Sequence, residues 1–81
     1  MMTPEMLKDL LESKIPQSTV RVTDLTGTFD HYMVDVSSPA FAGKSLLEQH
    51  KLVHAAVGNK LQAFGGPDAP IHALQIKTRT P

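Results

Sequence analysis

Residues 19–36, TVRVTDLTGTFDHYMVDV, decide the fold. Apolar residues fall at every second position on both sides of Gly27, with Val20 on one side and Tyr32 and Val34 on the other. This period of two is typical of half-exposed strands. Because the connection around Gly27 is short, the two strands are predicted to pair as an antiparallel hairpin.

A helix is predicted before this hairpin. Thr3 can cap it, Pro4 suits its first position, and Glu5 complements the helix dipole. The pair Ile15-Pro16 ends it, because the residue before a proline is pushed out of the helical region. Its apolar stripe consists of Met6, Leu7, Leu10 and Leu11.

A second helix follows the hairpin. Ser45 and Glu48 have the spacing of a capping box, so it should start near Ser45, after a loop over residues 41–44. His50 lies on or beside its buried stripe, and Asn59 is expected to cap a short third helix that carries Leu61 and Phe64. The residues expected to fill the inner face of the second helix are Leu46, Leu47, Val53, Ala56 and Val57.

The last element is a strand from Ile71 to Thr78, with His72, Leu74 and Ile76 on one face. Its long helical connection to the second strand predicts a parallel neighbour and a right-handed crossover. The predicted fold is therefore α+β in the order αββααβ, a single domain over residues 1–81. It has a three-stranded mixed sheet with helices on one face, similar in architecture to KH type II domains.

Composition excludes several functions. The chain has 81 residues, eight Lys and Arg against eight Asp and Glu, and no cysteine. A disulfide framework, a thiol nucleophile and a self-sufficient Cys-held metal site are excluded. Zero net charge disfavours strong binding to nucleic acid or acidic membrane. No apolar run approaches the ~20 residues of a bilayer span, and the N-terminus lacks a signal-peptide layout, so a soluble cytoplasmic protein is expected.

No catalytic motif supports an enzyme. The serines lack a GxSxG frame, and the capping box already explains Ser45. Gly65-Gly66 is followed by Pro67 and not by a phosphate-binding lysine, which excludes a P-loop.

The four histidines are the remaining candidates for metal chemistry, and two of them are related by topology. His31 and His72 stand at the starts of strands predicted to be parallel neighbours, so they should lie about one strand spacing (~4.8 Å) apart at one end of the sheet. Two imidazoles could hold a metal jointly, but they are too few for a closed site, so a partner would supply the rest. A solvated His31 and a packed His72 remain the alternatives. His50 and His54 have helical i, i+4 spacing but lack the glutamate of an HExxH motif.

Two segments resemble the BolA family: FAGKSLLEQHKLV over residues 41–53 and IHALQIKT over residues 71–78. The resemblance covers almost the whole chain and implies the same αββααβ fold. It also implies a partner, a monothiol glutaredoxin, and a role in iron–sulfur cluster and iron handling. In the heterodimer a [2Fe–2S] cluster is bridged by a cysteine of the glutaredoxin, a glutathione thiol and two ligands of the BolA-type chain.

The resemblance carries those two ligands onto His72, in the IHAL strand, and His31, in the loop between the first two strands. The chain therefore resembles the histidine-type branch of the family. His50 matches the histidine of the helix motif, where a structural or interface role is expected. His54 departs from the usual aromatic residue, and Gln49 stands where a basic residue is common.

Two other functions stay open. One is a KH-like nucleic-acid-binding transcriptional regulator, although the position of the KH GxxG loop reads VGNKL over residues 57–61, with one glycine. The other is a protein adaptor whose helix face over residues 44–54 regulates a glutaredoxin without sharing metal. Homodimerisation is also open.

Overall fold

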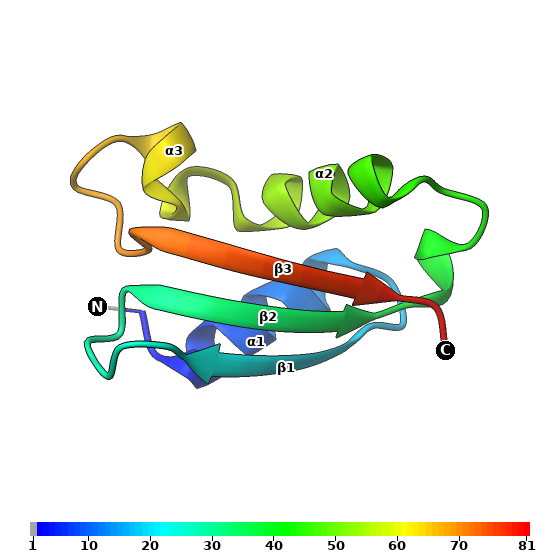
Figure 1. The fold of residues 1–81 in the computed structure, drawn as a ribbon, viewed down its shortest axis with the longest axis horizontal. Helices are drawn as coiled ribbons and strands as arrows, with labels where there is room; N and C mark the ends of the chain where they lie inside the picture. Colours follow the sequence, from blue (N-terminus) through cyan, green and yellow to red (C-terminus); the bar gives the residue numbers. More distant parts are fainter. Residues whose placement is uncertain (1) are drawn as a thin grey trace.

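The computed structural model describes residues 2–81, which form helices and strands in the predicted order (Figure 1). The α-helices are α1 (Pro4–Lys14), α2 (Leu46–Val57) and α3 (Gln62–Gly65). The strands are β1 (Thr19–Asp24), β2 (His31–Ser37) and β3 (Ala73–Arg79). Two single-turn 3-10 helices, η1 (Pro39–Phe41) and η2 (Gly58–Lys60), connect the longer elements.

The sheet has the order β1-β2-β3 and is mixed. β1 pairs antiparallel with β2, with Val20 opposite Val36. β3 pairs parallel with β2, with His31 opposite Ala73 and Val34 opposite Ile76. The predicted α+β architecture is confirmed, and the parallel pair brings the starts of β2 and β3 to one rim of the sheet.

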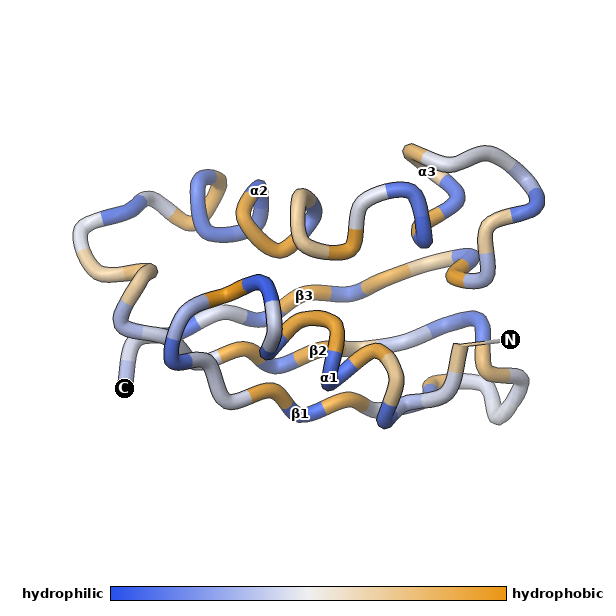
Figure 2. The backbone as a smooth tube through the Cα atoms, turned by 180° about the vertical axis from the view of Figure 1, so that it is seen from behind, coloured by the Kyte–Doolittle hydropathy of each residue, from blue (hydrophilic) through white to orange (hydrophobic). Residues whose placement is uncertain are grey.

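The helices cover one face of the sheet, with α1 across β1 and β2 and α2 along β3 (Figure 2). Along β2 the burial alternates strictly, so that Tyr32, Val34 and Val36 are buried and the residues between them are half-exposed. Removing these apolar side chains from water is the main stabilising contribution to such a domain. The other buried apolar side chains are Met2, Leu7, Leu11, Ile15, Val20, Phe41, Val53, Ala56, Val57, Leu61 and Ile71.

The predicted caps of α1 are confirmed. The Thr3 side chain accepts a hydrogen bond from the Met6 amide at 3.2 Å, Pro4 begins the helix, and Ile15 ends it in an extended conformation. Leu7 and Leu11 are fully buried, but Met6 is 50% exposed and does not belong to the inner stripe. The buried Tyr32 hydroxyl donates to the Met2 carbonyl and thereby ties the chain before α1 to β2.

The capping box of α2 is confirmed, but its predicted inner face is wrong in its first turn. Ser45 and Glu48 exchange the two reciprocal hydrogen bonds, and Val53, Ala56 and Val57 are buried. Leu46 and Leu47 are 63% and 65% exposed. Phe41 is fully buried and ends η1, so the predicted loop over residues 41–44 is wrong at its first residue.

The predicted cap of the third helix is also wrong. Asn59 lies inside η2, and Leu61 precedes α3 without a side-chain cap. Gly65 packs directly against the backbone of Asn59, where a Cβ would lie 2.0 Å from the carbonyl oxygen. This close approach explains why a glycine stands at the end of α3.

The third strand starts two residues later than predicted. Ile71 is fully buried and forms an isolated parallel bridge with Leu61, and His72 follows in a bend before β3 begins at Ala73. His72 is exposed, whereas Leu74 and Ile76 are partly buried against the core, so the predicted shared face is wrong for the histidine. None of the helices formed by residues 2–81 has the length and apolar composition needed to cross a membrane.

Candidate metal centre

His31 and His72 come together at the rim where β2 and β3 begin. Their imidazole rings stack with centroids 4.8 Å apart and an interplanar angle of 30°. His31 opens β2 directly opposite Ala73, which places the preceding residue, His72, beside it. The predicted proximity of the two rings is confirmed, and their role as metal ligands stays a prediction.

Asp30 fixes the backbone of the His72 segment. Its carbonyl oxygen accepts hydrogen bonds from the amide of His72 at 2.7 Å and from the amide of Ala73 at 3.2 Å. The residue before one histidine therefore holds the chain at the other. The peptide unit between Asp30 and His31 therefore leads into one histidine and also anchors the backbone of the other.

The loop between β1 and β2 is shaped by Asp24. Its carboxylate accepts hydrogen bonds from the amides of Thr26, Gly27 and Phe29 at 3.0–3.2 Å. Phe29 has a φ of 59°, a left-handed conformation that is uncommon outside glycine. The hydrogen bond from its backbone amide to the Asp24 carboxylate helps to hold it in this conformation. The loop closes where the Leu25 amide donates to the His31 carbonyl at 2.8 Å.

The Asp30 side chain contacts the His31 ring. Asp30 Oδ1 lies 2.8 Å from His31 Nδ1 and also accepts a hydrogen bond from the Thr28 hydroxyl. The Thr28 hydrogen bond, and after it the His31 hydrogen bond, hold the pKa of the Asp30 carboxyl below its ordinary value of 3.8. The carboxyl is therefore ionised at neutral pH and can only accept hydrogen bonds.

The rim is accessible to another molecule. The His31 side chain is 35% exposed, His72 is exposed, and the loop beside them presents Leu25 and Phe29 to solvent. Among residues 2–81, no group of three or more His, Cys, Asp and Glu side chains is arranged to hold a metal ion. The pair alone is therefore an incomplete site, as its two donors predict.

The other two histidines do not join this rim. The His54 ring packs edge-on against Phe64, with centroids 5.4 Å apart. His50 is half-buried, and its Nε2 atom is buried without a hydrogen-bond partner among residues 2–81. Within the described part of the chain, no third His, Cys, Asp or Glu side chain joins them to form a zinc site.

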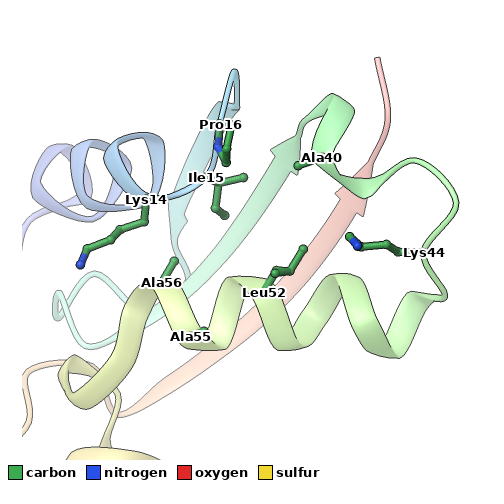
Figure 3. A pocket seen from close by; sticks show the side chains of 8 residues that line it. All are labelled: Lys14, Ile15, Pro16, Ala40, Lys44, Leu52, Ala55 and Ala56. Carbon is green, nitrogen blue, oxygen red and sulfur yellow. The ribbon is translucent and has the colours of Figure 1, made fainter.

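A separate apolar pocket lies between α1 and α2, beyond the other end of β2 (Figure 3). It has a volume of about 330 Å³, and its lining includes Ile15, Leu52 and Ala56, with Lys14 and Lys44 at its sides. No histidine contributes to it, so it is distinct from the rim.

Asp24 and Asp30 also build the rim, although no motif in the sequence predicts this role. A carboxylate three residues before a glycine and a carboxylate next to a candidate ligand are the signals that could have indicated them. Both signals are weak, because aspartate is common in turns for local reasons.

The fold and the rim define a class: a small α+β protein whose three-stranded mixed sheet presents two stacked histidines where its parallel strands begin. The profile of the BolA-like protein family matches residues 2–81. The chain belongs to this family, which confirms the resemblance seen in the sequence.

Similarity to individual proteins and structures agrees with this family assignment. An uncharacterised protein of Rickettsia prowazekii is 38% identical over 74 residues, which cover 91% of this chain and 88% of that protein. Human BolA-like protein 1 is 47% identical over 55 residues, which cover 68% of this chain but only 36% of the human protein. The structure of a bolA protein homologue from Coxiella burnetii matches with a TM-score of 0.74 and 33% identity, covering 100% of this chain and 94% of that one.

Proposed function

We propose that this chain forms a complex with a monothiol glutaredoxin and supplies His31 and His72 as ligands of a bridging [2Fe–2S] cluster. The observation that carries the proposal is the stacked pair of imidazoles at an exposed rim. Membership of the BolA-like family supports it, because the resemblance implies this partner. The sulfur ligands would come from a cysteine of the glutaredoxin and from glutathione, since the chain has no cysteine.

The donor set fits such a group. Neutral imidazoles are good ligands for iron, and two histidines on one iron with thiolates on the other is a known arrangement for [2Fe–2S] centres. When bound, the cluster would supply one-electron redox chemistry. His31 and His72 would replace two thiolates, which removes negative charge and raises the reduction potential.

The chain's contribution is therefore binding and positioning and not a catalytic step. The parallel register holds both rings at one rim, and the exposed loop residues Leu25 and Phe29 are available to a docked partner. A site with two donors from this chain and two from the glutaredoxin and its glutathione can be opened by separating the two proteins. This suits a role in passing on or storing iron–sulfur clusters.

Coexpression with a monothiol glutaredoxin tests the proposal. The purified complex is expected to show the absorption and EPR spectra of a histidine-coordinated [2Fe–2S] centre. His31→Ala and His72→Ala should each weaken or abolish the spectra of the histidine-coordinated centre, because each variant leaves the cluster one ligand short and the chain has no cysteine to replace it. His54→Ala is the matched control, because His54 packs on Phe64 away from the rim, and it should leave the spectra unchanged.

Two outcomes would contradict the proposal. Unchanged spectra in both rim variants would exclude His31 and His72 as ligands. A complex that forms without iron, and that survives loss of both histidines, would instead indicate an adaptor that regulates the glutaredoxin by contact alone.

A further inference from the structure

We propose that Asp30 is a positioning residue that keeps His31 in the tautomer with its proton on Nδ1, so that Nε2 is the nitrogen offered to a metal. The part of this proposal that concerns the metal rests on the proposed function. The part that concerns the tautomer is a property of the chain by itself.

The hydrogen bond between Asp30 and His31 defines where the proton lies. Asp30 Oδ1 and His31 Nδ1 are 2.8 Å apart, and an ionised carboxylate has no proton to donate. The shared proton therefore belongs to Nδ1. Neutral imidazole carries one proton, so Nε2 retains its lone pair.

Asp30 is itself held in place. The Thr28 hydroxyl donates to the same carboxylate oxygen, and the Thr26 hydroxyl lies 2.5 Å from that of Thr28. A chain of polar side chains thus runs along the loop to the ring. A carboxylate fixed in this way restricts rotation of the imidazole as well as its tautomer, which is the role that outer partners of metal-binding histidines perform.

The backbone of Asp30 serves the other histidine. Its carbonyl accepts the amide of His72, whereas its carboxylate contacts His31. A side-chain substitution at this position removes the contact with His31 and leaves the backbone contact to His72 in place. The two effects can therefore be separated, with His72 as an internal reference.

The first test uses the chain alone, without metal or partner. In a long-range ¹H–¹⁵N spectrum at about pH 8, where histidine is largely neutral, His31 is expected to be mainly the Nδ1–H form. Asp30→Ala should convert it to mainly the Nε2–H form, which is the form that free neutral imidazole side chains favour. Asp30→Asn should restore the Nδ1–H form, because the amide oxygen still accepts a hydrogen bond.

Asp35→Asn is the matched control. Asp35 lies on β2, the strand that begins with His31, and it pairs with Arg79. This variant therefore changes the charge on β2 without changing the contact between Asp30 and the His31 ring. His31 should keep its wild-type tautomer in it. The backbone amide signal of His72 should be similar in all variants, because its hydrogen bond to the Asp30 carbonyl is retained, and this shows that the rim is still folded.

The second test uses the complex with glutaredoxin. Asp30→Ala should lose the cluster to a chelator about tenfold faster than wild type, within the 10–100-fold range known for outer partners of metal ligands. The rate of cluster loss in Asp30→Asn should lie between the rates of Asp30→Ala and wild type. The rate in Asp35→Asn should match that of wild type.

The outcomes separate the two proposals. A wild-type His31 that is mainly Nε2–H, or an Asp30→Ala variant with an unchanged tautomer, overturns the assignment of Asp30 even where the cluster forms. A complex that holds no cluster overturns the proposed function, while the tautomer experiment still decides the role of Asp30.

Discussion

The imidazole rings of His31 and His72 stack 4.8 Å apart, although the two residues lie on opposite sides of α2 in the sequence. The contact follows from the parallel register of β2 and β3, which aligns the starts of the two strands. It joins two segments that are far apart in the sequence into one rim.

The ring stack can be measured directly. His72→Ala should shift the His31 ring protons in the ¹H spectrum, because the ring current of the neighbouring imidazole is lost. The free energy of unfolding should change by less than about 0.5 kcal/mol, since His72 is exposed. His54→Ala should leave the His31 protons in place, and a His72→Ala spectrum identical to wild type would contradict the stack.

Loop order depends on Asp24. Asp24→Ala removes the acceptor of three loop amides and should cost about 1 kcal/mol of stability. Amide hydrogen exchange should become faster over residues 26–29, with exchange in β2 nearly unchanged. Asp24→Asn retains one acceptor oxygen, so its amide exchange rates should lie between those of wild type and Asp24→Ala. Equal exchange rates in all three proteins would exclude this role for Asp24.

The corrected core predicts a contrast between neighbouring apolar residues. Phe41→Ala should destabilise the protein by about 3–5 kcal/mol, because Phe41 is fully buried. Leu47→Gln should change stability by less than about 0.5 kcal/mol, because Leu47 is 65% exposed. Urea denaturation compares them, and a large loss in Leu47→Gln would restore that residue to the inner face of α2.

Acid stability involves Glu12. A hydrogen bond from Lys8, and next one from the Val20 amide, lower the pKa of Glu12 below its ordinary value of 4.5. Because the folded pKa is the lower one, the contribution of Glu12 to stability is present above pH 4.5 and is lost as the pH falls through the folded pKa.

Glu12→Gln should therefore weaken the fall of stability with pH in this acidic range. The free energy of unfolding measured by denaturant at pH 6, 4 and 3 gives the comparison. Parallel curves for the variant and wild type would show that Glu12 contributes nothing to the acid dependence.

The end of α3 depends on the absence of a side chain at residue 65. In Gly65→Ala the new Cβ would meet the Asn59 carbonyl oxygen at 2.0 Å, so the backbone must move. Overpacking of this kind costs about 1–3 kcal/mol. Thermal unfolding measures the loss of stability. A variant as stable as wild type would show that the backbone of η2 and α3 moves apart without a cost in free energy, which contradicts this prediction.

Local patterns were sufficient for much of the fold. The alternation around Gly27 predicted the hairpin, and Thr3 and Ser45 predicted the starts of α1 and α2 correctly. These features depend on neighbours within a few residues, and the side-chain period and cap chemistry are properties of short segments. The order of elements then restricted the topology, because a long helical crossover joins parallel strands.

Tertiary packing decided the rest. Leu46 and Leu47 have the right spacing for an inner face, yet they are exposed, whereas Phe41 of the preceding 3-10 helix is buried. Periodicity alone cannot show which turns of a helix the rest of the fold covers. Likewise the sequence placed His31 and His72 at one rim, but it could not show the stacking of their rings or the contact with Asp30. The ring stack joins residues far apart in the chain, and only the folded register of β2 and β3 brings the two rings together. Asp30 and His31 are neighbours in the sequence, but their contact depends on side-chain conformations that the folded loop sets.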